Sequence, residues 1–431
     1  MWRIRIGNVF GMVEGDRVPM IALEKALTFV SSQEMVRSKI QKRKIAESLR
    51  ARGATPQEIE NRIQYLKQIG AIQNVNPICM FKEGLFPAGL LDIVLHVLGD
   101  DVEIVDETFL GGYELDSRFS EGHGPELREW QKEAIQAALR AKRGIINVGT
   151  GGGKTLVALH LIKETKKKFV YITERRNLVI QFASDLMKFF ADEELGIEVG
   201  KVSAAKVMNQ VAWKLAKVLD VGINNLGPNG GITTLASSKK LMDRSVGLVL
   251  FDEVHHAASR TARNVLPGFL SAGWRFGFTA TVKGRSDSLD KLAQAYIGDV
   301  IYKRTHVQLR EENIVCGVRV LMYPFDHCGV GNGIDDPVRL NRLCIVENTK
   351  RNRFITHILS AFAPNPVVVF VHQIKHGRTL LDMCKEQGLE AEFFNHRSDS
   401  ASLYERLQNP RGIIIATKIL TEGVNLSLIH I

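Results

Sequence analysis

The chain has 431 residues, of which 45% are hydrophobic and 24% charged, and its formal net charge at pH 7 is +10. At about 150 residues per domain, this length indicates two or three domains. No apolar run approaches the roughly 18 residues of a membrane span, and the N-terminus lacks the apolar core and cleavage site of a signal peptide. We therefore expect a cytoplasmic protein without a membrane segment, and its positive charge favours a polyanionic partner.

The five cysteines form no CxxC pair, and their odd number fits reduced thiols; they are residues 79, 316, 328, 344 and 384. His327 and Cys328 lie between two other cysteines, but the spacing matches no zinc template. We expect no structural metal there.

Three regions differ in pattern, and we place their boundaries at 1–115, 116–305 and 306–431. The first mixes strand-like alternation with a basic helical stretch. In the second, short apolar runs alternate with helical patterns, at 144–148, 169–173, 246–251 and 275–279. The third begins with an irregular linker over 307–353 and continues with apolar runs at 367–371 and 412–416 around a helix at 376–387. This alternation predicts an α/β fold, with two parallel-sheet domains behind a small, basic α+β domain.

A basic cluster lies in the first region, with one acid, Glu47, among seven basic residues: Arg37, Lys39, Lys42, Arg43, Lys44, Arg50 and Arg52. An approximate helical stripe of apolar residues between them places the charges on the exposed side. The cluster is either a solvated helix face or a set of phosphate contacts to nucleic acid.

A glycine loop in the second region predicts a phosphate site. Residues 147–155 read Asn-Val-Gly-Thr-Gly-Gly-Gly-Lys-Thr, after an apolar run and before an amphipathic segment at 156–161. Strand, glycine loop and helix form the context of a P-loop, in which backbone N–H groups surround the phosphates at a helix N-terminus. Lys154 is then expected to reach the β- and γ-phosphates and Thr155 to bind Mg²⁺, although Val148 replaces the glycine of the strict pattern. The predicted nucleotide-binding residues are Gly149, Thr150, Gly151, Gly152, Gly153, Lys154 and Thr155.

Two adjacent carboxylates, Asp252 and Glu253, follow the apolar run 246–251, at the edge where open α/β sheets bind ligands. We expect Asp252 to hold the Mg²⁺ and Glu253 to orient or deprotonate the attacking water. His255 and His256 are adjacent in the sequence, so we expect their side chains to point apart. This favours a structural role, or a role in coupling ATP hydrolysis to nucleic-acid binding, over metal binding. Thr279 and Thr281 end another strand, where hydroxyls can hydrogen-bond the acidic pair.

The order of these motifs resembles that of superfamily 2 helicases over about residues 127–426. The resemblance implies two RecA-like motor domains that use ATP, with Gln131 reading the base edge and Arg128 assisting. It assigns nucleic-acid contacts to four residues: Arg175, Gln181, Thr233 and Thr234. It assigns six further residues to the coupling between the nucleotide site and nucleic-acid binding: His255, His256, Thr279, Thr281, Thr417 and Gly423.

The arginine-containing motif VI of that family is absent after Leu426. Its arginines reach the γ-phosphate and can contribute about 10³ in rate. We therefore expect a C-terminally truncated chain with an incomplete second motor domain and weak or absent ATP hydrolysis.

Asp-Glu-x-His together with Thr-Ala-Thr resembles DNA-directed members of the superfamily. The UvsW-type phage recombination helicases have similar sequence segments before the motor and in the second motor domain. The matching residues here are 82–91 and 102–107, and 351–353 followed by 376–377. This implies branch migration, fork regression and annealing on branched or forked DNA, in the cytoplasm of a bacterial host. Two alternatives stay open: a restriction-type double-stranded DNA translocase, and an ATP- or DNA-binding fragment that does not hydrolyse. The sequence identifies no protein partner.

Overall fold

The fold is taken from a computed structural model, which describes the following residues: 2–30, 32–51, 53–68, 77–174, 176–191, 197–199, 228–238, 242, 244–280, 290–317, 319–326, 330, 333–334, 336–362, 365–395, 398, 406 and 411–417. They form two compact units. One holds the described residues up to Leu309, and the other holds those from Arg310 onward.

The first unit begins with a small mixed sheet of four strands in the order β5-β2-β1-β6. Strand β1 pairs antiparallel with β2 and parallel with β6, and its alternation buries Ile4 and Ile6 on one face. The elements of this part are β1 (Trp2–Ile6), β2 (Phe10–Glu14), α1 (Met20–Ala26), β3 (Thr28–Phe29), β4 (Ile78–Cys79), β5 (Leu85–Pro87), η1 (Ala88–Leu90), α4 (Leu91–Leu98) and β6 (Val102–Asp106).

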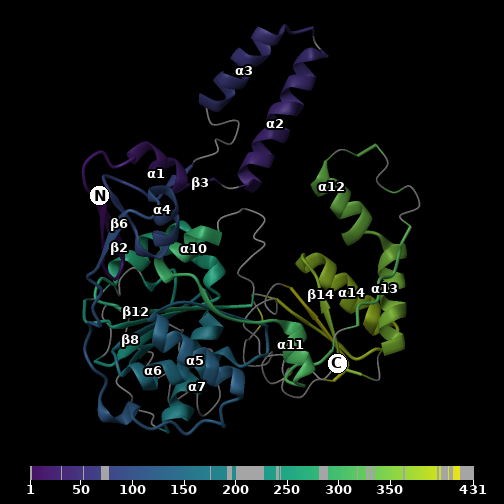
Figure 1. Ribbon diagram of the computed structural model, residues 1–431. Coiled ribbons are helices and arrows are strands. Elements are labelled where there is room, and N and C mark those ends of the chain that lie inside the picture. The colour runs from purple at the N-terminus through teal and green to yellow at the C-terminus, as the bar shows by residue number, and fades with distance from the viewer. Residues whose placement is uncertain are drawn as a thin grey trace. The chain divides into compact units, whose positions relative to one another are not determined.

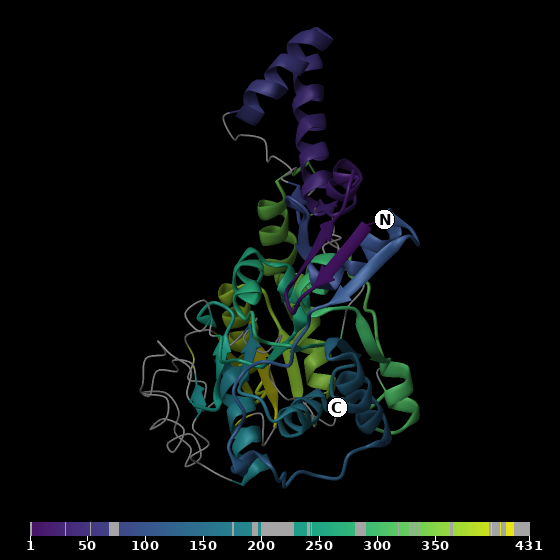
Figure 2. The same ribbon diagram turned by 60° about the vertical axis from the view of Figure 1, so that its left-hand side comes forward.

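A helical hairpin of α2 (Ser32–Arg50) and α3 (Pro56–Gln68) is inserted between β3 and β4, and its helices lie side by side (Figures 1 and 2). Ile59 and Ile63 are buried in the hairpin and pack against Ile45 and Leu49. Part of the apolar stripe predicted around the basic cluster, Ile45 and Leu49, thus lies on the inner face of this hairpin, whereas Ile40 is exposed.

The core of the first unit is a sheet of seven strands in the order β13-β7-β12-β11-β8-β10-β9, in which every pairing is parallel. The strands are continuous apolar runs in the sequence, which is typical of a parallel sheet that is covered on both faces. Helices α5, α6 and α7 lie together in Figure 1. The strands are β7 (Arg143–Val148), β8 (Phe169–Thr173), β9 (Ile197–Val199), β10 (Gly230–Thr234), β11 (Leu248–Asp252), β12 (Trp274–Thr279) and β13 (Val300–Arg304). The helical segments are η2 (Ser117–Phe119), α5 (Glu129–Ala141), α6 (Lys154–Thr165), α7 (Arg176–Phe190), η5 (Val254–Ala258), α9 (Arg260–Val265), η6 (Leu266–Gly268) and α10 (Asp290–Ile297).

The small sheet and the large sheet share one apolar core, and buried polar contacts join them. Asn8 of the small sheet donates to the carbonyls of Phe109 (3.0 Å) and Leu270 (3.3 Å). Arg143, at the start of β7, donates in turn to the Asn8 carbonyl at 3.4 Å. The small domain is therefore attached to the strand that leads into the glycine loop.

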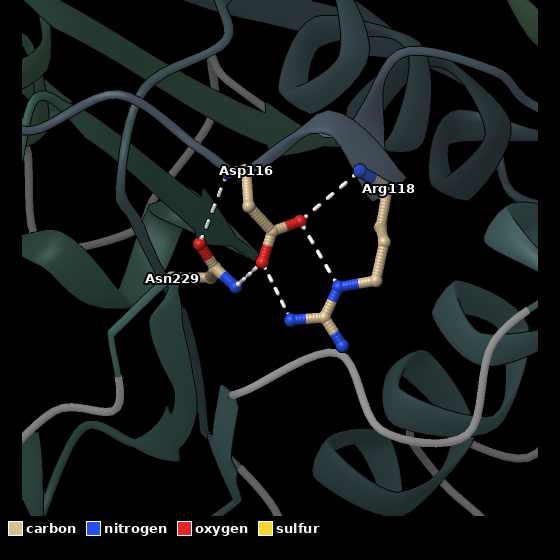
Figure 3. Close-up of polar contacts among 3 residues, drawn as sticks. All are labelled: Asp116, Arg118 and Asn229. Carbon is tan, nitrogen blue, oxygen red and sulfur yellow. Dashed lines mark hydrogen bonds and ion pairs between the residues drawn. The ribbon is translucent and has the colours of Figure 1, made fainter.

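The connector over residues 107–124 packs along the large sheet. The Tyr113 and Leu115 amides donate to the carbonyls of Ser245 (2.8 Å) and Lys166 (3.0 Å). Figure 3 shows Asp116 between Arg118 and Asn229: its carboxylate accepts from Asn229 Nδ2 (2.7 Å) and Arg118 Nη2 (2.6 Å), and its amide donates to Asn229 Oδ1 (3.3 Å). Because Asn229 directly precedes β10, the connector holds the start of that strand.

The second unit contains a parallel sheet of three strands in the order β14-β16-β15. Its elements are α12 (Pro337–Asn341), the π-helix η7 (Arg342–Val346), α13 (Thr349–Phe362), β14 (Val367–Phe370), α14 (Ile374–Glu386), β15 (Ala391–Phe394) and β16 (Ile413–Ala416); α11 (His306–Glu311) spans the boundary between the units. His376 Nε2 lies 3.0 Å from Asn352 Oδ1, which joins α13 to α14.

The segment 307–353, predicted as an irregular linker, contains helices. Asp336 lies in this segment, where its carboxylate accepts from the amides of Val338 and Arg339 and caps α12. An Asp N-cap followed by proline at the first helical position favours a helix start as much as a turn. The fold class itself, α/β with two parallel sheets behind a small α+β domain, is confirmed. Among the described residues, no helix has the length and apolarity of a membrane span.

Replacing Asn229 by Ala should lower the free energy of unfolding by about 1–3 kcal/mol, because the Asp116 carboxylate and amide both lose a buried partner. Urea unfolding at neutral pH measures the change. Glu121→Ala, at an exposed position of the same connector, serves as the control and should leave stability unchanged. Equal stability of both variants would show that the connector is not held by Asn229.

Candidate functional site

The glycine loop between β7 and α6 has a backbone that side chains would disturb. Gly151 and Gly153 adopt φ values of 78° and 98°, a region that favours glycine. The loop closes on itself through a hydrogen bond from the Gly152 amide to the Gly149 carbonyl at 3.2 Å. Lys154 and Thr155 then begin α6, so the loop ends at a helix N-terminus, as the sequence predicted.

Tight packing supports this loop. A Cβ atom at Gly152 would lie 2.7 Å from Val148 Cγ1 and 3.2 Å from Leu309 Cδ1. Leu309 is fully buried, and the Gly149 amide donates to the Arg304 carbonyl at 3.2 Å. Val148 therefore forms the floor of the loop, while the segment after β13 packs against it.

Lys154 lies within the loop and faces the acidic strand end. Its ammonium donates to the Val148 carbonyl at 3.1 Å. Burial lowers its pKa, and the charges of Glu253 and Asp252 oppose that shift. Lysine and carboxylates from distant parts of the sequence are thus brought within electrostatic reach.

Gln131 and Arg128, for which base reading was predicted, both contact the glycine loop in the structure. Gln131 Nε2 donates to the Gly153 carbonyl at 3.1 Å, and its Oε1 accepts from the Arg128 amide at 2.9 Å. Arg128 Nη1 lies 3.4 Å from the Gly152 carbonyl. Both residues therefore hold the loop to the start of α5.

Asp252 ends β11, and Glu253 adopts a left-handed conformation with φ of 50°. This turn allows the Glu253 amide to donate to Asp252 Oδ1 at 3.0 Å. A positive φ in a residue other than glycine stores strain and is typical of functional sites.

His255 connects the acidic pair to the end of β12. Its Nδ1 lies 3.3 Å from Glu253 Oε2 and 3.2 Å from Thr279 Oγ1. His255 thus contacts both Glu253 and the threonine that ends β12. The sequence led us to expect that the neighbouring His255 and His256 point apart, but their rings lie together, tilted by 39° with centroids 4.2 Å apart, because the two residues lie in the tight turn of η5.

The two carboxylates differ in protonation behaviour. Burial and the charge of Glu253 raise the pKa of Asp252, and Tyr171 and Lys154 only partly offset this. Burial also acts to raise the pKa of Glu253, but the hydrogen bond with His255 and the charge of Lys154 bring it below its ordinary value. Glu253 is therefore the more readily ionised of the pair, which suits an acceptor of protons.

Tyr171 was missed by the sequence analysis. It lies on β8, opposite Leu250 of β11, so its side chain is on the same face as Asp252 two residues further on. Its hydroxyl hydrogen-bonds the Asp252 carboxylate, and its ring stacks on Phe182 with centroids 3.5 Å apart. A tyrosine in a buried strand that is otherwise apolar up to Thr173 was the signal that the sequence offered.

The predicted nucleic-acid residues lie in several places. Thr233 and Thr234 end β10, where the Thr234 hydroxyl donates to Ser237 Oγ at 3.2 Å, and Gln181 is half-buried on α7. Of the basic cluster on α2, Lys39, Arg43 and Lys44 are exposed and Lys42 is half-buried. Arg175, Thr281 and Gly423 lie outside the described residues, as does the side chain of Arg37. Thr417 follows β16 in the second unit and is buried.

The loop fits a triphosphate: its conformation needs glycine, Cβ atoms would crowd it, and a lysine lies within it. Asp252 offers carboxylate oxygens of the kind that Mg²⁺ prefers. Within the described ranges, no group of three or more His, Cys, Asp or Glu side chains could hold a metal by itself.

A glycine loop, an acidic strand end and a threonine strand end lie on the adjacent parallel strands β7, β11 and β12, which is an arrangement suited to binding and hydrolysing a nucleoside triphosphate. Residues 124–284 match the family model described as "Type III restriction enzyme, res subunit". Over these residues the chain is similar to the helicase-family domain that this model describes.

Among curated relatives, the chain is 28% identical over 184 residues to DNA 3'-5' translocase XPB2 of Sulfurisphaera tokodaii, covering 43% of this chain and 37% of that protein. It is 20% identical over 322 residues to ATP-dependent DNA helicase uvsW of Enterobacteria phage T4, covering 70% and 60%. The crystal structure of T4 UvsW matches with a TM-score of 0.46 at 14% identity, over 96% of this chain and 80% of that one. The chain thus spans from about a third to three fifths of these curated relatives.

Replacing Gly152 by Ala should weaken binding of a ribose-labelled fluorescent ATP by about ten- to hundredfold, since overpacking typically costs about 1–3 kcal/mol. Val148→Ala removes the methyl groups that the new Cβ would meet. The double variant should therefore recover part of the affinity, whereas an additive loss would show that Val148 is not the limiting contact. Gly7→Ala, at which the new Cβ would lie 3.4 Å from the Phe10 carbonyl in ordinary contact, tests for unspecific effects of the substitution.

Proposed function

We propose that the protein is an ATP-dependent DNA helicase or translocase that acts on branched or forked DNA in phage recombination and replication. The contact between Glu253, His255 and Thr279, beside the glycine loop, carries this proposal. It links a hydrolytic carboxylate to a second strand end, which a nucleotide pocket alone does not need. The similarity to a DNA translocase and to a phage DNA helicase supports DNA as the partner.

In the proposed reaction, the amides of the glycine loop bind the phosphates and Lys154 neutralises their charge. Thr155 and Asp252 would hold Mg²⁺, which would supply positive charge to neutralise the phosphate oxygens. Glu253, kept ionised, orients a water molecule and accepts its proton. Tyr171 fixes the Asp252 carboxylate through its hydroxyl.

His255 is the proposed coupling residue. A proton or charge change on Glu253 alters its interaction with His255 Nδ1, and the same nitrogen contacts Thr279 at the end of β12. A change in the bound nucleotide can therefore alter the contacts of Thr279 at the end of β12. Thr233, Thr234, Gln181 and Arg175 are the proposed DNA contacts of this motor domain.

A second candidate function is translocation on double-stranded DNA of the restriction-enzyme type. The family model over residues 124–284 carries the description of a restriction subunit, which favours this alternative. A third possibility is a protein that binds ATP or DNA without turnover.

ATP hydrolysis measured with forked DNA, linear duplex and single strands separates these functions. Stimulation mainly by the fork would support the proposal, and equal stimulation by an unbranched duplex would favour the restriction-type translocase. Nucleotide binding with no stimulated hydrolysis would identify a binding fragment. In the first two cases Glu253→Gln should reduce the rate by about 100-fold or more while ATP binding persists, and Glu129→Gln, at an exposed position on α5, is the matched control.

The basic hairpin gives a separate prediction. Changing Lys39, Lys42 and Lys44 to Gln should weaken DNA binding, and the slope of log affinity against log salt should fall by about 2–3 if each lysine contacts a phosphate. Arg43 is left unchanged because it forms an ion pair with Glu47 at 2.7 Å. A control variant changes three exposed lysines elsewhere, Lys188, Lys303 and Lys385. An identical salt slope in both variants would assign the cluster to a solvated helix face.

A further inference from the structure

Strand β8 carries two polar residues at positions where apolar residues are expected. Its sequence over residues 169–173 is Phe-Val-Tyr-Ile-Thr, and every one of these residues is buried. A parallel strand that is covered on both faces is usually a continuous apolar run. Because side chains alternate along a strand, Tyr171 and Thr173 lie on the same face. The register with β11 pairs Tyr171 with Leu250, so this is also the face of Asp252.

Tyr171 has a fixed place beside the acidic strand end. It is 4% exposed, and its ring stacks on Phe182 of α7 with 8° between the ring planes. Its hydroxyl hydrogen-bonds the Asp252 carboxylate. Burial, followed by the charge of Asp252, raises the pKa of Tyr171 well above its ordinary value. The hydroxyl therefore keeps its proton and donates a hydrogen bond to the carboxylate.

The Asp252 carboxylate is thereby held by two donors. The Glu253 amide donates to its Oδ1 at 3.0 Å, and the Tyr171 hydroxyl is the second donor. The two oxygens of a carboxylate offer about four acceptor positions, so positions remain for a cation. Mg²⁺ requires near-ideal octahedral geometry, so the orientation of the carboxylate decides how well it binds the ion.

Thr173 is the second polar residue on this face. Since Ile172 pairs with Phe251, Thr173 and Asp252 are the next residues of the two parallel strands. Thr173 is fully buried, and among the described residues its hydroxyl has no hydrogen-bond partner. A buried hydroxyl without a partner is destabilising, whereas valine would fill the same space without this cost. These observations point to a partner that arrives with a ligand, and Mg²⁺ in proteins usually keeps several water molecules.

We propose that Tyr171 and Thr173 are positioning residues for the Mg²⁺ of the nucleotide site: Tyr171 orients the Asp252 carboxylate, and Thr173 hydrogen-bonds a water molecule that the ion carries. This inference rests on the proposed nucleotide site and deepens it with two residues that do not touch the nucleotide. Hydrogen-bond partners of metal ligands typically contribute about ten- to hundredfold to metal affinity. The two hydroxyls therefore determine how much Mg²⁺ strengthens nucleotide binding.

Binding of a ribose-labelled, non-hydrolysable ATP analogue to the full chain tests this inference. Its affinity is measured with saturating Mg²⁺ and again with EDTA, and the ratio of the two affinities gives the contribution of the ion. The measurement does not depend on turnover. Thermal unfolding of every variant without nucleotide measures stability.

The variants remove single hydroxyls and keep the shape of each side chain. Tyr171→Phe retains the ring and its stacking on Phe182. Thr173→Val removes the unpartnered hydroxyl, and Thr173→Ser retains it as the conservative variant. Tyr296→Phe and Thr165→Val are the matched controls, because they remove hydroxyls from buried residues elsewhere in the same unit.

The affinity ratio should fall by about tenfold in Tyr171→Phe and by about three- to tenfold in Thr173→Val, while the affinity in EDTA stays at the wild-type value. Thr173→Ser and both controls should keep the wild-type ratio. Thr173→Val should also unfold at the wild-type temperature or above it, because it no longer buries an unpartnered hydroxyl. A merely structural role would not combine a weaker effect of Mg²⁺ with undiminished stability.

An unchanged affinity ratio in both Tyr171→Phe and Thr173→Val would overturn the inference and leave the proposed function standing. A lower unfolding temperature of Thr173→Val, with equal losses of affinity in Mg²⁺ and in EDTA, would show that this hydroxyl is structural and would overturn its assigned role. Failure of the wild type to bind the analogue under either condition would overturn the proposed nucleotide site as well.

Discussion

The close approach of backbone and side chains around Gly152 is the constraint on which the site depends. Val148 supports the loop from below and Leu309 packs against it, so the loop has little freedom to choose another path. Gln131 adds a hydrogen bond at Gly153. Because protein interiors are close-packed, a loop held in this way carries the position of Lys154 with it.

Parallel strand order then decides which residues meet Lys154. Strand β12 lies between β7 and β11, so the loop, the acidic pair and Thr279 share one edge of the sheet although about 100 residues separate the first two along the chain. The same neighbour relation brings Tyr171 of β8 to Asp252. The chemistry of the site is therefore a property of the sheet as much as of its motifs.

The first unit is larger than its motor sheet. Asn8 and Arg143 join the small domain to the start of β7, and Asp116 joins the connector to the start of β10. Both contacts are at the amino ends of strands whose carboxyl ends carry predicted nucleotide or DNA residues. The small domain and the connector thus brace the strands from the edge opposite the site.

The sequence determined the type and order of the main elements, because long apolar runs and a glycine loop between strand and helix constrain the backbone locally. Residues 169–173 were predicted and found as a strand, and Lys154, Asp252 and Glu253 were recognised from their places after strands. Only the tertiary structure decided that Gln131 contacts the loop, that His255 lies between Glu253 and Thr279, and that Tyr171 bonds Asp252. The reason is physical: local pattern sets which face a side chain occupies, whereas its partner depends on strand order and on the direction in which a neighbouring turn leaves the sheet.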